Sequence, residues 1–126
     1  PDPFTRPFCW AIHRPMDFKA MERAAEVLSG RHDFRAFTAL NGPEREDTVR
    51  DLTRLEIAVR GRRVRITAES AGFLYKMVRS LVGALVAAGE GRMTPEAVKA
   101  LLEARTRTPL VQTAPPQGLF LMKVFY

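Results

Sequence analysis

Hydrophobic residues recur along this chain with two spacings, one near 3.6 residues and one of two residues. The first spacing predicts α-helices and the second predicts β-strands. Short stretches rich in Gly, Pro and Asp separate these segments and mark loops. In chain order the pattern predicts a strand over 8–12, a helix capped by Asp17 and ending at Leu28, a hairpin over 54–69, a helix from Gly72 to Ala88, a helix from Pro95 to Ala104, and a strand over 119–126.

The hairpin is the most regular part of this pattern. Apolar residues alternate with polar or charged ones along 54–60 and again along 63–69. A two-residue turn at Gly61-Arg62 joins the two runs, and glycine in its first position favours a type II′ turn. With that turn the apolar residues of both strands share one face, and an arginine and a glutamate meet on the other. The predicted pairs are Val59 with Val64, Ile57 with Ile66, Leu55 with Ala68, and Arg54 with Glu69.

The order of the predicted elements defines the fold class. Strand, helix, two-stranded hairpin, helix, extra helix and strand is the split βαβ order of ferredoxin-like α+β sandwiches, with helices on one face of an antiparallel sheet. The last strand is apolar on both faces, which is typical of a strand that is covered on both. We expect residues 8–126 to form this domain and residues 1–7, with three prolines, to be a linker.

The stretch from Gly72 to Gly83 is apolar apart from one narrow polar stripe. Numbered as a helix, it places Lys76, Arg79, Ser80 and Gly83 on one side. A helix that is apolar on its other sides is buried there, so we expect the stripe to face a cleft, a partner or another domain. Two interpretations of Arg79 stay open. Either its stem covers apolar surface while the guanidinium stays in water, or the guanidinium binds a carboxylate or phosphate.

Composition indicates the class of partner and the cellular compartment of the protein. The chain has 126 residues, of which 46% are hydrophobic, enough for one domain with a core. Its net charge of +6 and its pI near 10.2 indicate a polyanionic partner. The single cysteine, Cys9, favours a reducing compartment, and no apolar run reaches the roughly 20 residues of a membrane span. We therefore expect a cytoplasmic protein, and, because the chain begins at Pro1, a piece of a longer one.

Candidate chemistry outside the central helix is limited. His32 and Asp33 are adjacent, but neighbouring side chains on a regular element point apart, so we expect them to cap and pack. His13, His32 and Cys9 do not have the spacing of metal ligands, and no metal site is predicted. Four arginines within 60–65 form a basic run. Such a run is either a solvated face or a contact surface for nucleic acid.

Four motifs, spread over the chain, resemble those of one family. They read Gly30-x-His-Asp-Phe-x-x-Phe37, Thr48-x-Arg50, Phe73-Leu-x-x-Met-Val-Arg-x-x-Val-Gly83 and Thr113-Ala-Pro-x-x-Gly-Leu119. Their order and spacing resemble the C-terminal half of the bacterial tRNA pseudouridine synthase A family, which isomerises uridines in the anticodon stem-loop of tRNA. The chain departs from the family pattern at Arg35, at Glu46-Asp47 and at Ser80, where a small, a basic and an Asn residue are common.

The resemblance implies an enzyme whose active site lies between two halves. The family's catalytic aspartate belongs to the N-terminal half, in an Arg-x-x-Asp-x-Gly-x-His-Ala type motif that this sequence lacks. Arg79 matches the arginine that pairs with this aspartate across the cleft. The other implied site residues are Phe73 and Val78, which line the active site, and Arg50, Lys76, Arg62 and Arg63, which contact RNA.

The same resemblance implies the partners. They are tRNA, the missing N-terminal half and, for the complete protein, a second copy in a homodimer; no metal or organic cofactor is implied. The reacting uridine has to leave its base stack to be cut from its ribose and rejoined through C5. We expect the isolated chain to fold and to be inactive, because the catalytic aspartate is absent from it.

Two interpretations from other functional classes remain. A non-catalytic, ferredoxin-like RNA-binding module would bind RNA with strong salt dependence as its whole function. A protein-interaction domain is suggested by the doubly apolar final strand, and it would have no affinity for RNA at low salt. The coding sequence upstream of Pro1 separates the first of these from the enzyme.

Overall fold

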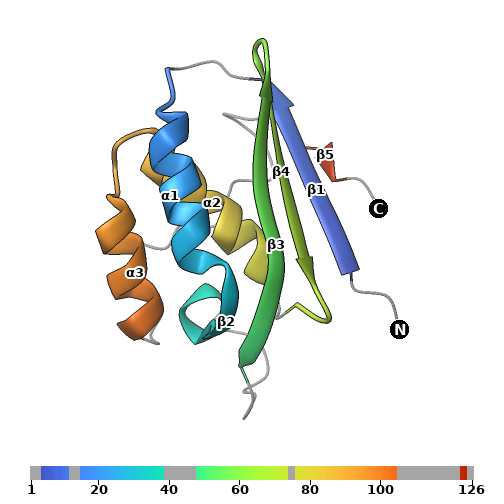
Figure 1. Cartoon of the computed structure of the whole chain (residues 1–126), viewed down its shortest axis with the longest axis vertical. Coiled ribbons are helices and arrows are strands. Elements are labelled where there is room, and N and C mark those ends of the chain that lie inside the picture. Colours follow the sequence, from blue (N-terminus) through green and yellow to red (C-terminus); the bar gives the residue numbers. More distant parts are fainter. Residues whose placement is uncertain (1–3, 12–14, 39–47, 74–75, 105–122, 125–126) are drawn as a thin grey trace.

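A computed structural model describes residues 4–11, 15–38, 48–73, 76–104 and 123–124. Figure 1 shows a single sheet with all of its helices packed on one side. The elements are β1 (Phe4–Ala11), α1 (Phe18–Leu28), β2 (Gly30–Asp33), the 3₁₀ helix η1 (Arg35–Phe37), β3 (Val49–Arg60), β4 (Arg63–Ser70), α2 (Met77–Gly89), α3 (Pro95–Ala104) and β5 (Lys123–Val124).

The sheet has the topology that the element order predicts. Its strands lie in the order β2-β3-β4-β1-β5, and all described pairs are antiparallel. Because β4 lies between β1 and β3, the first strand–helix–strand unit is split by the hairpin's second strand, as in ferredoxin-like sandwiches. The predicted fold class is therefore confirmed. The short edge strand β2 was not predicted, since four residues are too few to establish a period.

The hairpin register is also confirmed. Val59 pairs with Val64 and Leu55 with Ala68, as the alternation requires. Gly61 has a φ of +56°, and among the described non-glycine residues Lys76 alone has a positive φ, so the turn is of the type II′ kind. Arg54 lies opposite Glu69.

The first strand begins earlier than predicted. Phe4 to Pro7, assigned to a linker from their composition, pair with Ser70 to Thr67 of β4 and belong to the sheet. A proline within a run argues against a central strand, which is why the sequence pattern placed the start at Phe8. Pro7 is buried despite this, on the face of the sheet that no described helix covers. We call that side of the sheet the open face.

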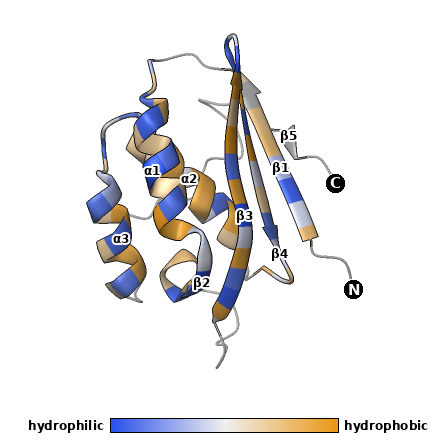
Figure 2. Ribbon diagram, viewed as in Figure 1, coloured by the Kyte–Doolittle hydropathy of each residue, from blue (hydrophilic) through white to orange (hydrophobic). Residues whose placement is uncertain are grey.

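The core lies between the sheet and the helices. Asp17 caps α1 by accepting a hydrogen bond from the Ala20 amide at 3.1 Å, and Thr94 caps α3 through the Ala97 amide at 3.0 Å, as predicted. α1 packs against both α2 and α3. Figure 2 shows hydrophobic colour along almost all of α2 and mixed colours along α1 and α3. α2 is therefore the central core helix.

The start of α2 corrects one prediction. The helix begins at Met77 and not at Gly72, because Lys76 at its N-cap has a left-handed φ of +56°. The predicted polar stripe divides as a result. Lys76 is exposed and Arg79 half-buried, whereas Ser80 and Gly83 are buried in the core. The Ser80 hydroxyl is satisfied there by donating to the Lys76 carbonyl oxygen at 3.1 Å.

Several predictions fall on residues outside the described ones. They concern His13, the loop over 41–47, the motif over 113–119, and most of the final strand, of which β5 is the described part. In β5, Val124 pairs with Phe8 and Lys123 with Cys9 of β1. Among the described residues, no helix has the length and apolar character needed to cross a membrane.

Candidate functional site

Most of the predicted site residues lie at one end of the sheet. β4 ends at Ser70, opposite Leu52 near the start of β3, and α2 begins shortly after it. Arg50, Phe73 and Arg79 therefore lie at this end, which we call the α2 end. The turn between β3 and β4 lies at the opposite end of the sheet, which we call the hairpin end (Figure 1).

A tight turn leads the chain from β4 toward α2. The Ser70 hydroxyl donates to the Gly72 carbonyl oxygen at 2.8 Å and accepts from the Gly72 amide at 3.4 Å, with Ser70 only 1% exposed. The hydrophobic pattern did not predict this turn, because it began a helix directly at Gly72. Its signal is a serine followed two residues later by glycine, a combination that favours turns over helices.

Arg50 lies against this turn. A Cβ placed on Gly72 would lie 3.9 Å from the Nε atom of Arg50, an ordinary contact distance, so the guanidinium and the turn are close neighbours. Arg50 is half-buried and donates from Nη1 to the carbonyl oxygen of Val49 at 2.7 Å. The strand and the turn thus hold one predicted RNA-contacting arginine at the α2 end.

The first turn of α2 carries two electrostatic features of the same sign. The Ser80 amide bonds to the Lys76 carbonyl oxygen at 3.1 Å, and no side chain caps the helix N-terminus. The first amides of a helix have no partner within the helix, and the aligned peptide dipoles attract negative charge to them. Arg79 and the exposed Lys76 add positive charge at this same place. The α2 end is therefore a strongly anion-attracting part of the surface.

Arg79 is the most informative residue of this group. It is half-buried, and the described part of the chain provides it with no hydrogen bond or ion pair. A cation in the first turn of a helix interacts unfavourably with the helix dipole, so Arg79 is not placed there to stabilise α2. Its guanidinium has donors for a planar anion such as a carboxylate or a phosphate.

Phe73 and Val78 supply apolar surface beside this charge. Both are half-buried and pack against the core cluster, Phe73 from the segment before α2 and Val78 from its first turn. Each side chain is thus partly core and partly exposed, close in sequence to Arg79. Their predicted role in lining the active site stays a prediction.

Arg62 and Arg63 lie at the other end. Arg62 is in the turn and Arg63 begins β4, and both are exposed. A strand of the length of β4 spans about 23 Å at 3.3 Å per residue. The structure therefore divides the predicted RNA-contacting residues into two groups, with Arg50 and Lys76 at the α2 end and Arg62 and Arg63 at the hairpin end.

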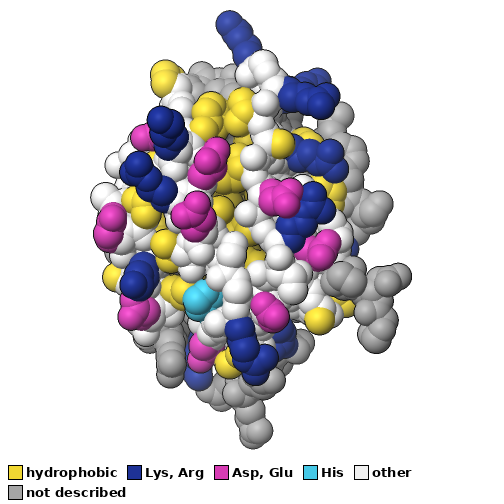
Figure 3. Space-filling view, in the orientation of Figure 1, with side chains coloured by type: hydrophobic (Ala, Val, Ile, Leu, Met, Phe, Trp, Pro, Cys, Tyr) yellow, Lys and Arg dark blue, Asp and Glu magenta, His cyan; other side chains and the backbone are white. Residues whose placement is uncertain are grey.

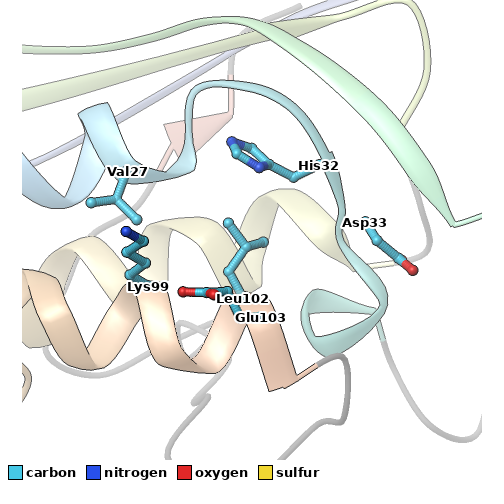
Figure 4. A pocket seen from close by; sticks show the side chains of 6 residues that line it. All are labelled: Val27, His32, Asp33, Lys99, Leu102 and Glu103. Atoms are coloured by element: carbon cyan, nitrogen blue, oxygen red, sulfur yellow. The ribbon is translucent and has the colours of Figure 1, made fainter.

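A pocket of about 440 Å³ lies on the helix side, between α1, α3 and β2. Figure 4 shows its lining, with Asp33 turned away from the others. Its six lining residues are Val27, His32, Asp33, Lys99, Leu102 and Glu103, and none of them is a serine, threonine or cysteine nucleophile.

His32 and Asp33 have separate structural partners. The Nε2–H of His32 donates to the Ser29 carbonyl oxygen at 2.8 Å. Asp33 accepts from the Thr48 hydroxyl and, at 3.1 Å, from the Arg35 amide, and so fixes the start of η1. The two side chains thus have the capping and packing roles that the sequence favours over catalysis. Within the described ranges, no group of three or more His, Cys, Asp or Glu side chains could hold a metal ion.

Comparison with known proteins identifies the family. A family model described as tRNA pseudouridine synthase matches residues 24–126. The chain is 43% identical over 117 residues to tRNA pseudouridine synthase A of Allorhizobium ampelinum, covering 93% of this chain and 45% of that protein. It is 42% identical over 126 residues to the protein of the same name from Moorella thermoacetica, covering 100% of this chain and 51% of that protein. The chain thus spans about half the length of these relatives.

Proposed function

The chain belongs to the tRNA pseudouridine synthase family, and we propose that it is the C-terminal domain of an enzyme that converts uridine to pseudouridine in the anticodon stem-loop of tRNA. One observation supports the proposal most directly. Arg79 lies half-buried at the α2 end, and the described part of the chain gives it no anionic partner. In the complete enzyme that partner is the catalytic aspartate of the N-terminal half.

The chemistry that we propose is an isomerisation in which atoms and electrons balance. The bond between N1 of uracil and C1′ of ribose breaks, the base turns, and a bond from C5 to C1′ forms. The hydrogen on C5 leaves as a proton to solvent, and N1 takes up a proton. No oxidant, metal or organic cofactor is needed for this exchange, which agrees with the cofactor-free enzyme that the family implies.

Arg79 is the positioning partner of the aspartate in this proposal. A guanidinium beside a carboxylate lowers the carboxylate's pKa and keeps it ionised, so that it can attack C1′ or accept a proton. The pair also limits the cost of burying either charge, because each charge then has a partner. Phe73 and Val78 form the apolar wall for the flipped base, and Arg50 and Lys76 bind phosphates beside it.

The direct test is release of tritium from tRNA labelled at C5 of uridine. We expect no release by the chain alone, and release when the N-terminal half of a relative such as the Moorella thermoacetica enzyme is added. Arg79→Ala in the mixture should strongly reduce the rate of release, whereas Arg23→Ala, an exposed residue on α1, should not. Release by the chain alone would contradict the proposed location of the catalytic aspartate. Normal release by the Arg79 variant would contradict the role of Arg79.

A second function is favoured by the open face, whose arginines at the hairpin end are exposed. The chain would then be a non-catalytic RNA-binding module, and no partner half would restore activity. An Arg-x-x-Asp-x-Gly-x-His-Ala type motif upstream of Pro1 in the coding sequence would decide for the enzyme. For the complete enzyme we also propose a homodimer in the cytoplasm, which sedimentation and fractionation would test.

A further inference from the structure

The open face at the hairpin end is a strongly charged surface that the proposed active site does not use. Three arginines of this face, Arg60, Arg63 and Arg65, lie on the two strands, and Arg62 is in the turn that joins them. All four are exposed. We call these four residues the basic hairpin face. Figure 3 shows Lys and Arg side chains gathered around this end of the molecule, with Asp and Glu side chains lying farther from it.

Strand geometry makes this cluster dense. Arg60 and Arg63 are direct cross-strand partners, and Arg65 lies on the same side of β4, opposite Ala58. Alternate residues of a strand are about 6.7 Å apart, and neighbouring strands about 4.8 Å. Like charges directly opposite each other destabilise a sheet pair. The hairpin therefore concentrates positive charge at a cost to its own stability.

Two acidic side chains of the open face, Glu56 and Glu69, are engaged away from this cluster. Glu56 accepts from Arg54 at 2.9 Å. Glu69, at the α2 end of β4, accepts from the hydroxyls of Thr5 at 3.2 Å and Thr53 at 3.4 Å. Among the described residues, the four arginines of the basic hairpin face have no hydrogen bond or ion pair. An external polyanion is then the complementary partner.

We infer that the basic hairpin face is a second RNA-binding site, which holds the phosphate backbone of the same tRNA whose uridine enters the α2 end. The inference rests on the proposed function and adds Arg60 and Arg65 to the RNA-contacting residues. The two ends are about 23 Å apart along β4, so the site holds nucleotides away from the reacting one. Exposed arginines bind phosphates without reading sequence, and their contribution is affinity that falls with salt.

The occupant is RNA and not an acidic protein, because of the shape of the cluster. Arginine forks bind phosphates bidentately, and a backbone with regularly spaced phosphates matches arginines repeated along two strands. The face also has little apolar surface at this end, where the neutral residues beside the arginines are Ala58, Ala11 and the half-buried Cys9. A protein interface normally has an apolar centre with aromatic residues.

The test is binding of unmodified tRNA transcript to this chain between 50 and 300 mM salt. We expect Arg60→Ser/Arg65→Ser to raise Kd at least tenfold at 50 mM salt. The slope of log Kd against log salt should fall by about 0.7–0.9 for each lost contact. The matched control is Lys19→Ser/Arg23→Ser, which removes two exposed cations from α1. It lowers the net charge of +6 by the same amount as Arg60→Ser/Arg65→Ser does. Its Kd should change less than twofold, and both variants should keep the circular dichroism of the parent.

Three outcomes would overturn the inference. They are no binding of tRNA by the parent chain at 50 mM salt, equal loss in the two double variants, and polyaspartate competing as well as tRNA. None of them bears on the proposed function, because tritium release by the two halves is measured separately. Conversely, the arginines could pass this test while the two halves release no tritium. That result would support the RNA-binding module and contradict the proposed synthase function.

Discussion

Arg54 and Glu56 lie two residues apart on the open face of β3, with Nη2 of the arginine 2.9 Å from Oε2 of the glutamate. The hairpin period predicted that Arg54 lies opposite Glu69, and it does. Which acid the guanidinium binds was not predictable, because the pattern determines the face of a side chain and not its rotamer. The hydrogen bond from Arg54, with a smaller coulombic attraction, holds the pKa of the Glu56 carboxyl below its ordinary value.

At this scale we predict that Arg54→Ser raises the pKa of Glu56 to the ordinary range of an exposed glutamate. The carboxyl carbon of Glu56 reports this pKa in an NMR titration. A lowered acid pKa contributes stability above its unfolded value and loses that contribution as pH falls. The pair is exposed, so we expect no measurable difference in Tm between Arg54→Ser and the parent chain at any pH from 3 to 7. Lys19→Ser is the control, and an unchanged Glu56 pKa in Arg54→Ser would contradict the assigned bond.

Among the elements, α2 shows what hydrophobic periodicity can predict and what it cannot. Its apolar residues predicted a core helix ending near Ala88, and the structure confirms this. Its start was wrong because an apolar run from Gly72 onward fits a helix equally well, while a left-handed lysine and a serine-based turn have no periodic signal. The short strand β2 and the first residues of β1 were missed for similar local reasons.

The close approach of α1 to the end of α2 gives the element-scale prediction. A Cβ on Gly89 would lie 2.8 Å from Cγ and Sδ of Met21, and the Gly89 carbonyl oxygen accepts from the Asp17 amide at 2.8 Å. Alanine favours a helix over glycine by roughly 1 kcal/mol, but overpacking costs about 1–3 kcal/mol. We expect Gly89→Ala to lower the free energy of unfolding in urea by about 1–2 kcal/mol.

A double-mutant cycle checks the cause. In a Met21→Ala background one obstacle to the added methyl group is gone, while Cε of Met16, 2.9 Å from the same Cβ position, remains. Gly89→Ala should therefore cost less there, with a coupling of about 1 kcal/mol. Additive effects of the two substitutions would mean that Met21 is not the main obstacle, and that contact with Met16 or a disturbed Asp17–Gly89 hydrogen bond carries the cost.

For the whole molecule, the sequence predicted the fold and the family, since element order and motif order both survive errors of a few residues at element ends. The positions of the site residues relative to one another came only from the sheet. It places Arg79 and Arg50 at the α2 end, and the basic hairpin face at the other. The anion that we propose as the partner of Arg79 could not be derived from this chain's own residues, because among those described none bonds to it.

This separation of two ends predicts two separable kinetic effects in the enzyme reconstituted from both halves. Arg79→Ala removes an interaction at the reacting group, so we expect kcat to fall at least 100-fold with KM for tRNA within about threefold. Arg60→Ser/Arg65→Ser weakens a remote backbone contact, so we expect KM to rise at least tenfold and kcat to change less than threefold. Initial rates of tritium release under multiple turnover, at saturating and limiting tRNA, measure both. If both variants reduced kcat alike, the basic hairpin face would affect the chemical step as well. The α2 end and the hairpin end would then not have separate roles in catalysis and in tRNA binding.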